Sequence, residues 1–196
     1  MNQSEQKTVA VFGASSRELA PAIAEAARQL GELLAQRGYR CVLGGGASGV
    51  MGNVTDGVMQ AGGHVQGVIP KWMVDKGWCY DRLDDVLVTA DMHQRQEMLL
   101  QQAHAVVAMP GGCGTLAELT EAITWRQLGL ITMPIVILNV DHFFDPLLEM
   151  MRQCAAQRLM KQSHLRLWQV AESPLAAVRA VERGWSEGCT APEDKL

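Results

Sequence analysis

The chain has 196 residues, of which 48% are hydrophobic and 19% charged, and its formal net charge is −4. This balance is typical of a globular protein and excludes an intrinsically disordered chain. The sequence holds neither the basic footprint of a nucleic-acid-binding protein nor a polybasic membrane patch. We therefore expect no nucleic-acid partner and no membrane partner.

Three features of the sequence predict a cytoplasmic location. The polar residues at the start of the chain lack the apolar core of a signal peptide. The longest apolar stretch, roughly residues 128–140, is interrupted by polar residues and proline and is too short to span a bilayer. The cysteines are scattered without a CxxC pair, which is typical of free thiols in a reducing compartment. They are Cys41, Cys79, Cys113, Cys154 and Cys189.

In chain order, short β-rich runs alternate with longer segments of helical periodicity. A strand over residues 8–12 precedes a helix over about 21–37, which Gly38 ends. A strand over 39–43 and a helix over about 49–60 follow, and then a strand over 64–69, which Pro70 closes. Residues 71–84, which include two tryptophans, are predicted to be irregular. The sequence leaves open whether this segment is a flap that closes over a ligand.

The second half of the chain continues the alternation. A strand over residues 86–88 leads to a helix over about 92–102, and a strand over 105–109 leads to a helix over roughly 116–128. Residues 135–138 form the last clear central strand. Helices around 146–157 and 174–183 complete the folded part, and a polar tail follows at 190–196.

These strands are apolar on both faces, which indicates a parallel sheet with helices on both sides. We therefore predict an α/β Rossmann-like three-layer sandwich that forms a single nucleotide-binding domain, residues 1–196, with a core of about 8–185 and polar tails. Ligands of such sheets bind beyond the carboxyl ends of the strands. Glycine clusters fall at those ends, at Gly13, at residues 44–46 and at residues 111–114.

The strongest local signal is the glycine-rich loop that spans residues 110–115. Glycines after a strand let the backbone approach an anion closely, and the helix that follows offers unpaired N–H groups and a positive dipole end. The loop is neither a Walker A loop nor a GxGxxG fingerprint, which disfavours a nucleotide triphosphatase and a dehydrogenase. Cys113 lies in this loop, but the absence of a neighbouring base in the sequence disfavours a nucleophile.

Glu118 has two interpretations. Thr115 and Glu118 have the spacing of a helix capping box, in which the glutamate satisfies a backbone N–H. Alternatively, Glu118 and Glu121 share one helix face and place two carboxylates beside the anion-binding loop. Such a pair can stabilise an oxocarbenium-like transition state and can orient or deprotonate water. An ordinary solvated helix face explains Glu121 equally well on local grounds.

Arg95 also has two interpretations. It begins a helix just past a strand end, where its guanidinium can clamp a phosphate or stabilise a departing base. Alternatively, it forms a surface ion pair with Glu97 or Asp91. The neighbouring His93, taken alone, is more often a structural histidine than a catalytic one.

Several motifs together resemble one known family. They are VFGASS at 11–16, GGGASGVMG at 44–52, GVIP at 67–70, MHQR at 92–95, PGGCGTLAE at 110–118, AITWRQLG at 122–129 and PIVILN at 134–139. In order and spacing, over about residues 8–185, they resemble the Lonely guy family. Members of this family are phosphoribohydrolases that release cytokinin-type bases from nucleoside 5′-monophosphates, and older names for them include "putative lysine decarboxylase".

The resemblance implies a hydrolase that gives a free base and ribose 5-phosphate, with no metal and no organic cofactor. It implies that Arg95 and Glu118 are the catalytic pair. It also implies a likeness to dimeric proteins, so we expect a homodimer, for which the helix at 125–128 offers an interface. The substrate-binding residues that it implies are Ala14, Ser15, Gly45, Gly46, Met92, His93, Gly111, Gly112, Gly114, Thr115 and Glu121.

Two other functions are alternatives to this one. A lysine decarboxylase needs a pyridoxal phosphate Schiff-base lysine, and only Lys71 lies near a predicted strand end. A carrier that binds a nucleotide or a phosphorylated cofactor without turnover needs the glycine loop but not Glu118. Gln96 replaces the usual lysine of the family, and GASS replaces its commoner GSS. The preferred base, whether cytokinin-type, adenine or another, therefore stays open.

Overall fold

The structure of the protein is a computed structural model, and it describes residues 6–188. Its strands form one sheet of seven, ordered β4-β3-β2-β1-β5-β6-β7, in which every neighbouring pair is parallel. The strands are β1 (Thr8–Phe12), β2 (Arg40–Leu43), β3 (Val65–Pro70), β4 (Asp85–Thr89), β5 (Ala105–Ala108), β6 (Ile135–Leu138) and β7 (Gln169–Ala171). The parallel α/β fold is thus confirmed, while the tail predicted at 190–196 lies outside the described residues.

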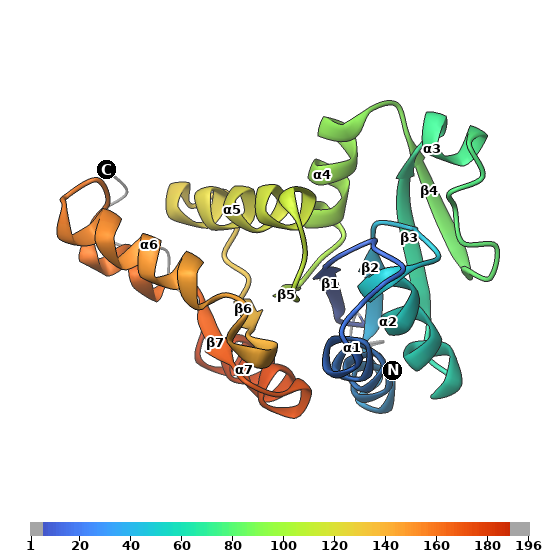
Figure 1. Cartoon of the computed structure of the whole chain (residues 1–196), viewed down its shortest axis with the longest axis horizontal. Helices are drawn as coiled ribbons and strands as arrows, with labels where there is room; N and C mark the ends of the chain where they lie inside the picture. Colours follow the sequence, from blue (N-terminus) through green and yellow to red (C-terminus); the bar gives the residue numbers. More distant parts are fainter. Residues whose placement is uncertain (1–5, 189–196) are drawn as a thin grey trace, which may run out of the picture.

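Helices cover both faces of the sheet, which gives three layers (Figure 1). One face carries α1 (Pro21–Gln36), α2 (Gly49–Gln60) and α7 (Pro174–Glu187). The other carries α4 (Met92–Gln101), α5 (Cys113–Leu128) and α6 (Asp145–Ala156). The short helix α3 (Lys71–Asp75) follows β3 directly, and two 3-10 turns, η1 (Val140–His142) and η2 (Gln162–Arg166), flank α6.

Alternate residues of the central strands enter two separate cores. In β1, Val9 and Val11 pack with α1, α2 and α7, whereas Ala10 and Phe12 pack with α4 and α5. All five residues of this strand are buried. A strand that is buried on both faces is apolar at nearly every position, and in β1 only Thr8 at its start is polar. This near-continuous apolar run explains why the sequence predicts the central strands so well.

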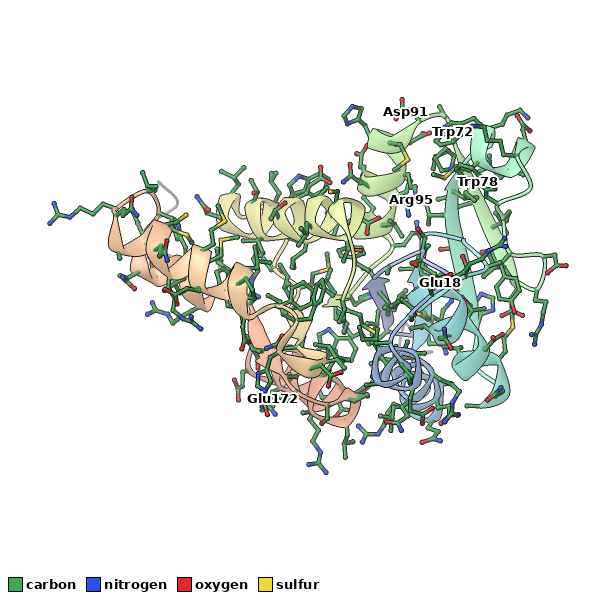
Figure 2. All side chains as sticks on the ribbon, viewed as in Figure 1. Glu18, Trp72, Trp78, Asp91, Arg95 and Glu172 are labelled. Carbon is green, nitrogen blue, oxygen red and sulfur yellow. The ribbon has the colours of Figure 1, made fainter. Side chains whose placement is uncertain are left out.

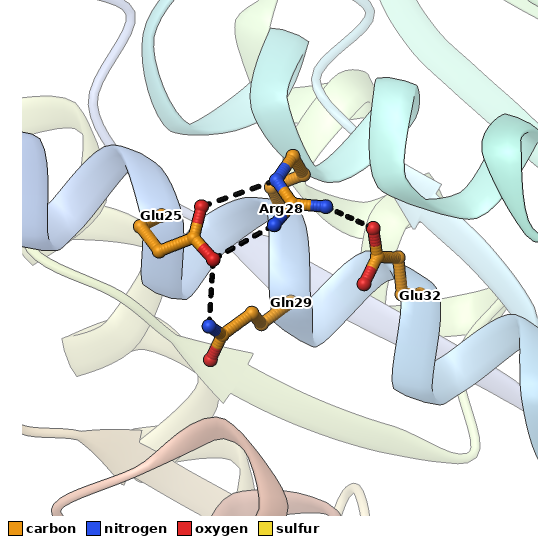
Figure 3. A network of polar contacts seen from close by, with 4 residues as sticks. All are labelled: Glu25, Arg28, Gln29 and Glu32. Atoms are coloured by element: carbon orange, nitrogen blue, oxygen red, sulfur yellow. Dashed lines mark hydrogen bonds and ion pairs between the residues drawn. The ribbon is translucent and has the colours of Figure 1, made fainter.

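Helix α1 illustrates how one sequence segment serves both the core and the solvent. Its first residue is Pro21, whose fixed φ suits the start of a helix. On its solvent side, Arg28 bonds to the carboxylates of Glu25 and Glu32, and Gln29 donates to Glu25 as well (Figure 3). Pairs at this spacing lie on the same face of a helix and add a small stabilisation to it.

Three elements differ from the sequence-based expectation. Residues 71–75 form helix α3 rather than an irregular run, and an ion pair of 2.7 Å between Lys71 Nζ and Asp75 Oδ1 spans it. Strand β7 was missed because it has only three residues, and Val170 in it is 46% exposed. Helix α5 begins at Cys113 instead of about residue 116.

The topology fixes where a ligand can enter. From β1 the sheet grows toward β4 on one side, and from β5 it grows toward β7 on the other. The loops that follow β1 and β5 therefore diverge to opposite faces, and a crevice opens between them at the carboxyl ends of the strands. Within residues 6–188, no helix has both the length and the apolar character that crossing a membrane requires.

Candidate functional site

A cavity of about 840 Å³ lies at the carboxyl ends of β1, β2 and β3. Its walls come from the loop after β1, the glycine loop after β2, the segment around α3 and the first turns of α4 and α5. The lining residues lie within the ranges 11–17, 44–51, 69–78, 92–95 and 112–118. The crevice that the sheet order requires is therefore lined in part by the glycine clusters of the sequence.

Helix α4 holds its position through a cap at its amino end. Asp91 Oδ1 accepts hydrogen bonds of 2.9 Å from the backbone N–H groups of His93 and Gln94. The side chain of Gln94 in turn accepts a bond of 2.7 Å from the N–H of Ala90. These reciprocal bonds satisfy the free donors of the first turn and fix the start of the helix. Arg95 follows one turn later and borders the cavity; Figure 2 shows it on α4 below Asp91.

Arg95 and Glu118 form a buried ion pair at this cavity. The guanidinium Nη1 donates to the Glu118 carboxylate at 2.7 Å, and Nε donates to the carbonyl of Val68 at 3.1 Å. Arg95 is only 8% exposed and Glu118 only 9%. A Cβ on Gly44 would lie 2.0 Å from Nη2, so the guanidinium packs against bare backbone. The alternative interpretation of Arg95, a surface ion pair with Glu97 or Asp91, is therefore wrong.

The capping-box interpretation of Glu118 is also wrong. Helix α5 has Gly112 as its N-cap, and no side chain caps it. Thr115 consequently lies inside the first turn rather than before it, and Glu118 lies one turn further on. The Glu118 carboxylate bonds to Arg95 on the neighbouring helix. Its position is thus set by a tertiary contact and not by its own helix.

The surroundings of Glu118 change its proton affinity. Burial raises the pKa of Glu118, the Arg95 guanidinium opposes this, and the Glu121 carboxylate adds to the rise; the net direction is upward from 4.5. Burial also raises the pKa of Glu121, against an opposing effect of His93. Glu121 Oε2 is buried without a hydrogen-bond partner. Two carboxyl groups of raised pKa therefore lie one turn apart on α5.

Close backbone contacts hold the loop over residues 110–115 against the loop after β1. The N–H of Ala14 donates to the carbonyl of Pro110 at 3.1 Å, and the carbonyl of Ala14 accepts from Val50 at 2.7 Å. A Cβ on Gly111 would lie 2.1 Å from Thr115 Oγ1 and 2.8 Å from the Ala14 nitrogen. Only glycine fits there. The amino end of α5, with its free N–H groups, is thereby placed at the cavity.

The cavity brings together most of the residues that the sequence singled out. Those on its wall are Ala14, Ser15, Gly46, Met92, Arg95, Gly112, Gly114, Thr115 and Glu118. Four others stand behind the wall or outside it. Gly111 supports Thr115, and Gly45, with a φ of +75°, packs against Ile69. His93 is exposed on α4, and Glu121 lies one turn beyond Glu118.

Sequence reasoning missed several lining residues. Arg17 lies just beyond the VFGASS motif, and Ser48 lies within the GGGASGVMG motif but was not among the expected substrate-binding residues. Met73 and Trp78 belong to the segment that was expected to be irregular. Arg17 is exposed, and no hydrogen bond or ion pair joins it to another described residue. The signal that could have identified Arg17 was an arginine in the loop that follows the first strand, four residues after Gly13.

No other part of the described chain offers comparable chemistry. A second cavity, of about 630 Å³, lies near the amino ends of β1 and β5 and is lined by Lys7, His104 and Trp185, but no carboxylate among residues 6–188 borders it. Nor do these residues include a group of three or more His, Cys, Asp or Glu side chains able to hold a metal ion. Cys41, Cys79, Cys113 and Cys154 are free thiols, and Cys189 lies outside the described residues.

Comparison with known proteins gives sequence relatives over most of the chain. The family model described as "Possible lysine decarboxylase" matches residues 51–181. Cytokinin riboside 5′-monophosphate phosphoribohydrolase LOG7 of Arabidopsis thaliana is 39% identical over 180 residues, which cover 92% of this chain and 83% of that protein. LOG5 of the same plant is 36% identical over 180 residues and is covered to 79%.

Solved structures with the same fold are more distant in sequence. The molybdenum cofactor binding protein of Rippkaea orientalis superposes with a TM-score of 0.72 at 23% identity, over 92% of this chain and 98% of that one. The Moco carrier protein of Chlamydomonas reinhardtii superposes with a TM-score of 0.71 at 24% identity, over 93% and 99%. At this level of identity the likeness establishes the fold alone.

We predict that Gly111→Ala destabilises the protein by about 1–3 kcal/mol, because the new methyl group overlaps Thr115 and the Ala14 backbone. Gly114→Ala in the same loop is the matched control, since nothing lies within 4 Å of its Cβ position. The control should leave stability unchanged or slightly higher. Urea denaturation of the two variants measures the difference, and equal stabilities would contradict the close packing of the loop.

We further predict that Arg95→Met lowers the free energy of unfolding by about 3–5 kcal/mol at neutral pH, because Glu118 stays buried without its partner. Without the guanidinium, the pKa of Glu118 in the folded state lies further above its ordinary value of 4.5. The folded protein then binds a proton that the unfolded chain does not, so the loss shrinks as the pH falls through the raised pKa.

Two further variants control this measurement. Arg152→Met removes an exposed ion pair with Glu149 and should leave the free energy of unfolding nearly unchanged, because water solvates both groups. The double variant Arg95→Met/Glu118→Gln should lose the pH dependence, because the titrating group is gone. A deficit of Arg95→Met that stays constant from pH 8 to pH 5 would show that the pair is not electrostatically coupled.

Proposed function

Because this chain belongs to the Lonely guy family, the cytokinin riboside 5′-monophosphate phosphoribohydrolases, we propose that it hydrolyses the N-glycosidic bond of a nucleoside 5′-monophosphate. The products are the free base and ribose 5-phosphate. One observation carries the proposal: the buried Arg95–Glu118 pair borders the same cavity as the amino end of α5. The Glu118 carboxylate thus lies in the same cavity as a helix amino end, whose free N–H groups favour an anion.

The 5′-phosphate binds at the amino end of α5. Free N–H groups of the first turn and the positive end of the helix dipole attract it, and Gly112 and Gly114 leave the backbone accessible. Thr115 adds a hydroxyl from the same turn. Arg17, which also lines the cavity, has no partner among the described residues and supplies the positive charge that the glycine loop lacks.

Glu118 then faces the ribose. As the bond between C1′ and the base nitrogen breaks, its electron pair leaves with the base and positive charge develops on the ribosyl group. The Glu118 carboxylate stabilises that charge and orients a water molecule, whose oxygen bonds to C1′. One proton of the water goes to the departing base. Arg95 holds the carboxylate in place through its bond of 2.7 Å and anchors the substrate.

A lysine decarboxylase, the activity that the family model's description names, does not fit this cavity. Its chemistry requires a lysine that forms a Schiff base with pyridoxal phosphate. No lysine of the described residues borders the cavity, and Lys71, after β3, is exposed and paired with Asp75. Lys195 lies outside the described residues. The hydrolase remains the better explanation of the site.

The whole chain acts, in this proposal, as one nucleotide-binding domain in a cytoplasmic homodimer. The exposed side chains of Leu128 and Leu130 at the carboxyl end of α5 support an interface there, since exposed apolar groups favour burial against a second copy. No resident metal or organic cofactor takes part in the proposed reaction, because the substrate supplies the phosphate and water supplies the nucleophile.

We predict that Glu118→Gln lowers kcat for base release from adenosine 5′-monophosphate by about 10²–10⁴-fold, because a neutral amide cannot stabilise the ribosyl cation. The glutamine still accepts the Arg95 hydrogen bond, so the variant should stay folded. Glu97→Gln on α4 is the matched control and should keep full activity. Adenine and ribose 5-phosphate are measured by chromatography. Unchanged turnover in Glu118→Gln would refute the catalytic role, and nucleotide binding without any turnover in the unmodified protein would indicate a carrier.

We also predict an acid limb in the pH profile of kcat/KM. Glu118 must be ionised to act, and its pKa lies above 4.5, so activity should fall as the pH drops through that raised value. Because the Glu121 carboxylate contributes to the rise, Glu121→Gln should move the limb to lower pH. A limb that stays in place, or moves to higher pH, would contradict this coupling.

A further inference from the structure

The two ends of the cavity differ in chemistry. Toward β1 and β5 the wall is polar, with Ser15, Arg17 and the first turn of α5. Toward β3 and β4, at the edge of the sheet, the wall is made of Met73, Trp78 and other apolar side chains. The Arg95–Glu118 pair lies between these ends, because Arg95 contacts Gly44, directly after β2, and Val68 in β3.

Trp78 is the largest side chain on the apolar wall, and it is held in place although it is 51% exposed. Its ring meets that of Trp72 edge-on, with centroids 5.7 Å apart, and Lys76 Nζ lies over both rings at 5.1 Å. The backbone N–H of Trp78 donates to the carbonyl of Met73 at 3.1 Å. Figure 2 shows both tryptophans beside α3, at the end of the sheet where Arg95 and Asp91 lie.

The segment that carries Trp78 is tied to the glycine loop after β2. Gly46 and Cys79 form an isolated antiparallel bridge, and the N–H of Tyr80 donates to the carbonyl of Gly45 at 2.9 Å. The Tyr80 hydroxyl also donates to Asp56 on α2 at 2.8 Å. The backbone is thus held at Trp78 and at the two residues that follow it. An exposed indole on such a fixed segment loses little conformational freedom when a flat ligand covers it.

We propose that Trp78 determines base specificity by stacking on the base of the nucleotide. The inference rests on the proposed function, and it follows from the order of groups along the cavity. With the phosphate at the amino end of α5 and the ribose at Glu118, the base reaches the wall formed by Met73 and Trp78. A purine presents a larger flat face to the indole than a pyrimidine does, so stacking on Trp78 contributes more affinity to a purine nucleotide than to a pyrimidine nucleotide.

The test separates the base from the rest of the nucleotide and does not depend on turnover. Affinities for adenosine 5′-monophosphate, uridine 5′-monophosphate and ribose 5-phosphate are measured by calorimetry in the Glu118→Gln background. Trp78→Leu should weaken adenosine 5′-monophosphate binding by about tenfold, the size of one lost stacking contact, and reduce its advantage over the uridine nucleotide. Ribose 5-phosphate affinity should change less than about twofold, because that ligand has no base to stack.

Trp72→Phe is the matched control, since it also removes an indole from this segment, at a ring that does not border the cavity, but keeps an aromatic ring for the edge contact with Trp78. It should leave adenosine 5′-monophosphate affinity within about threefold, and Trp78→Phe should retain most of the affinity. In the active enzyme, Trp78→Leu should raise KM for adenosine 5′-monophosphate more than it lowers kcat.

Three results would overturn the inference. Unchanged nucleotide affinity in Trp78→Leu would place the base elsewhere. An equal loss for adenosine 5′-monophosphate and ribose 5-phosphate would show that Trp78 only supports the fold of the segment, as would an equal effect of Trp72→Phe. If the protein binds nucleotides but never releases the base, the hydrolase proposal fails while these affinities still decide the role of Trp78.

Discussion

The buried ion pair between Arg95 and Glu118 is the interaction on which the arrangement of the site depends. Two charges removed from water destabilise a protein unless each meets the other in good geometry. The pair joins α4 to α5, and the second bond of Arg95 joins α4 to β3. The carboxylate that faces the cavity is therefore held by three elements that are far apart in the sequence. It is preorganised before any ligand arrives, which is what stabilisation of a developing charge requires.

Glycines make this pair and its anion site compatible with one small crevice. Gly44 gives the Arg95 guanidinium its space, and Gly111 lets Thr115 and Ala14 approach each other. A methyl group at either position would overlap atoms that the site needs. The glycine clusters at the strand ends thus do two things: they leave backbone N–H groups accessible at the cavity, and at Gly44 they allow the Arg95 side chain to reach the backbone.

The fold by itself leaves the activity open. Moco carrier proteins with 23–24% identity share the sheet and its helices, yet their names describe binding of a cofactor. The family model is described by a decarboxylase activity for which the cavity offers no suitable lysine among the described residues. Function on such a fold resides in a few side chains at the crevice. Here the informative ones are a carboxylate, an arginine and an aromatic side chain at the rim.

The sequence by itself determined the central strands, most helices and the glycine loops, because these features depend on local periodicity and on backbone conformations that only glycine adopts. It also indicated Arg95 and Glu118 as a pair through resemblance, but local reasoning favoured a surface ion pair for one and a helix cap for the other. Only the tertiary structure decided between these roles, since their contact spans residues 95 and 118 on separate helices. The same holds for β7, which is too short to show periodicity, and for Trp78, whose place at the cavity depends on how α3 packs beside the sheet. Contacts between distant segments carry no local pattern, and the packing of the whole sheet sets them.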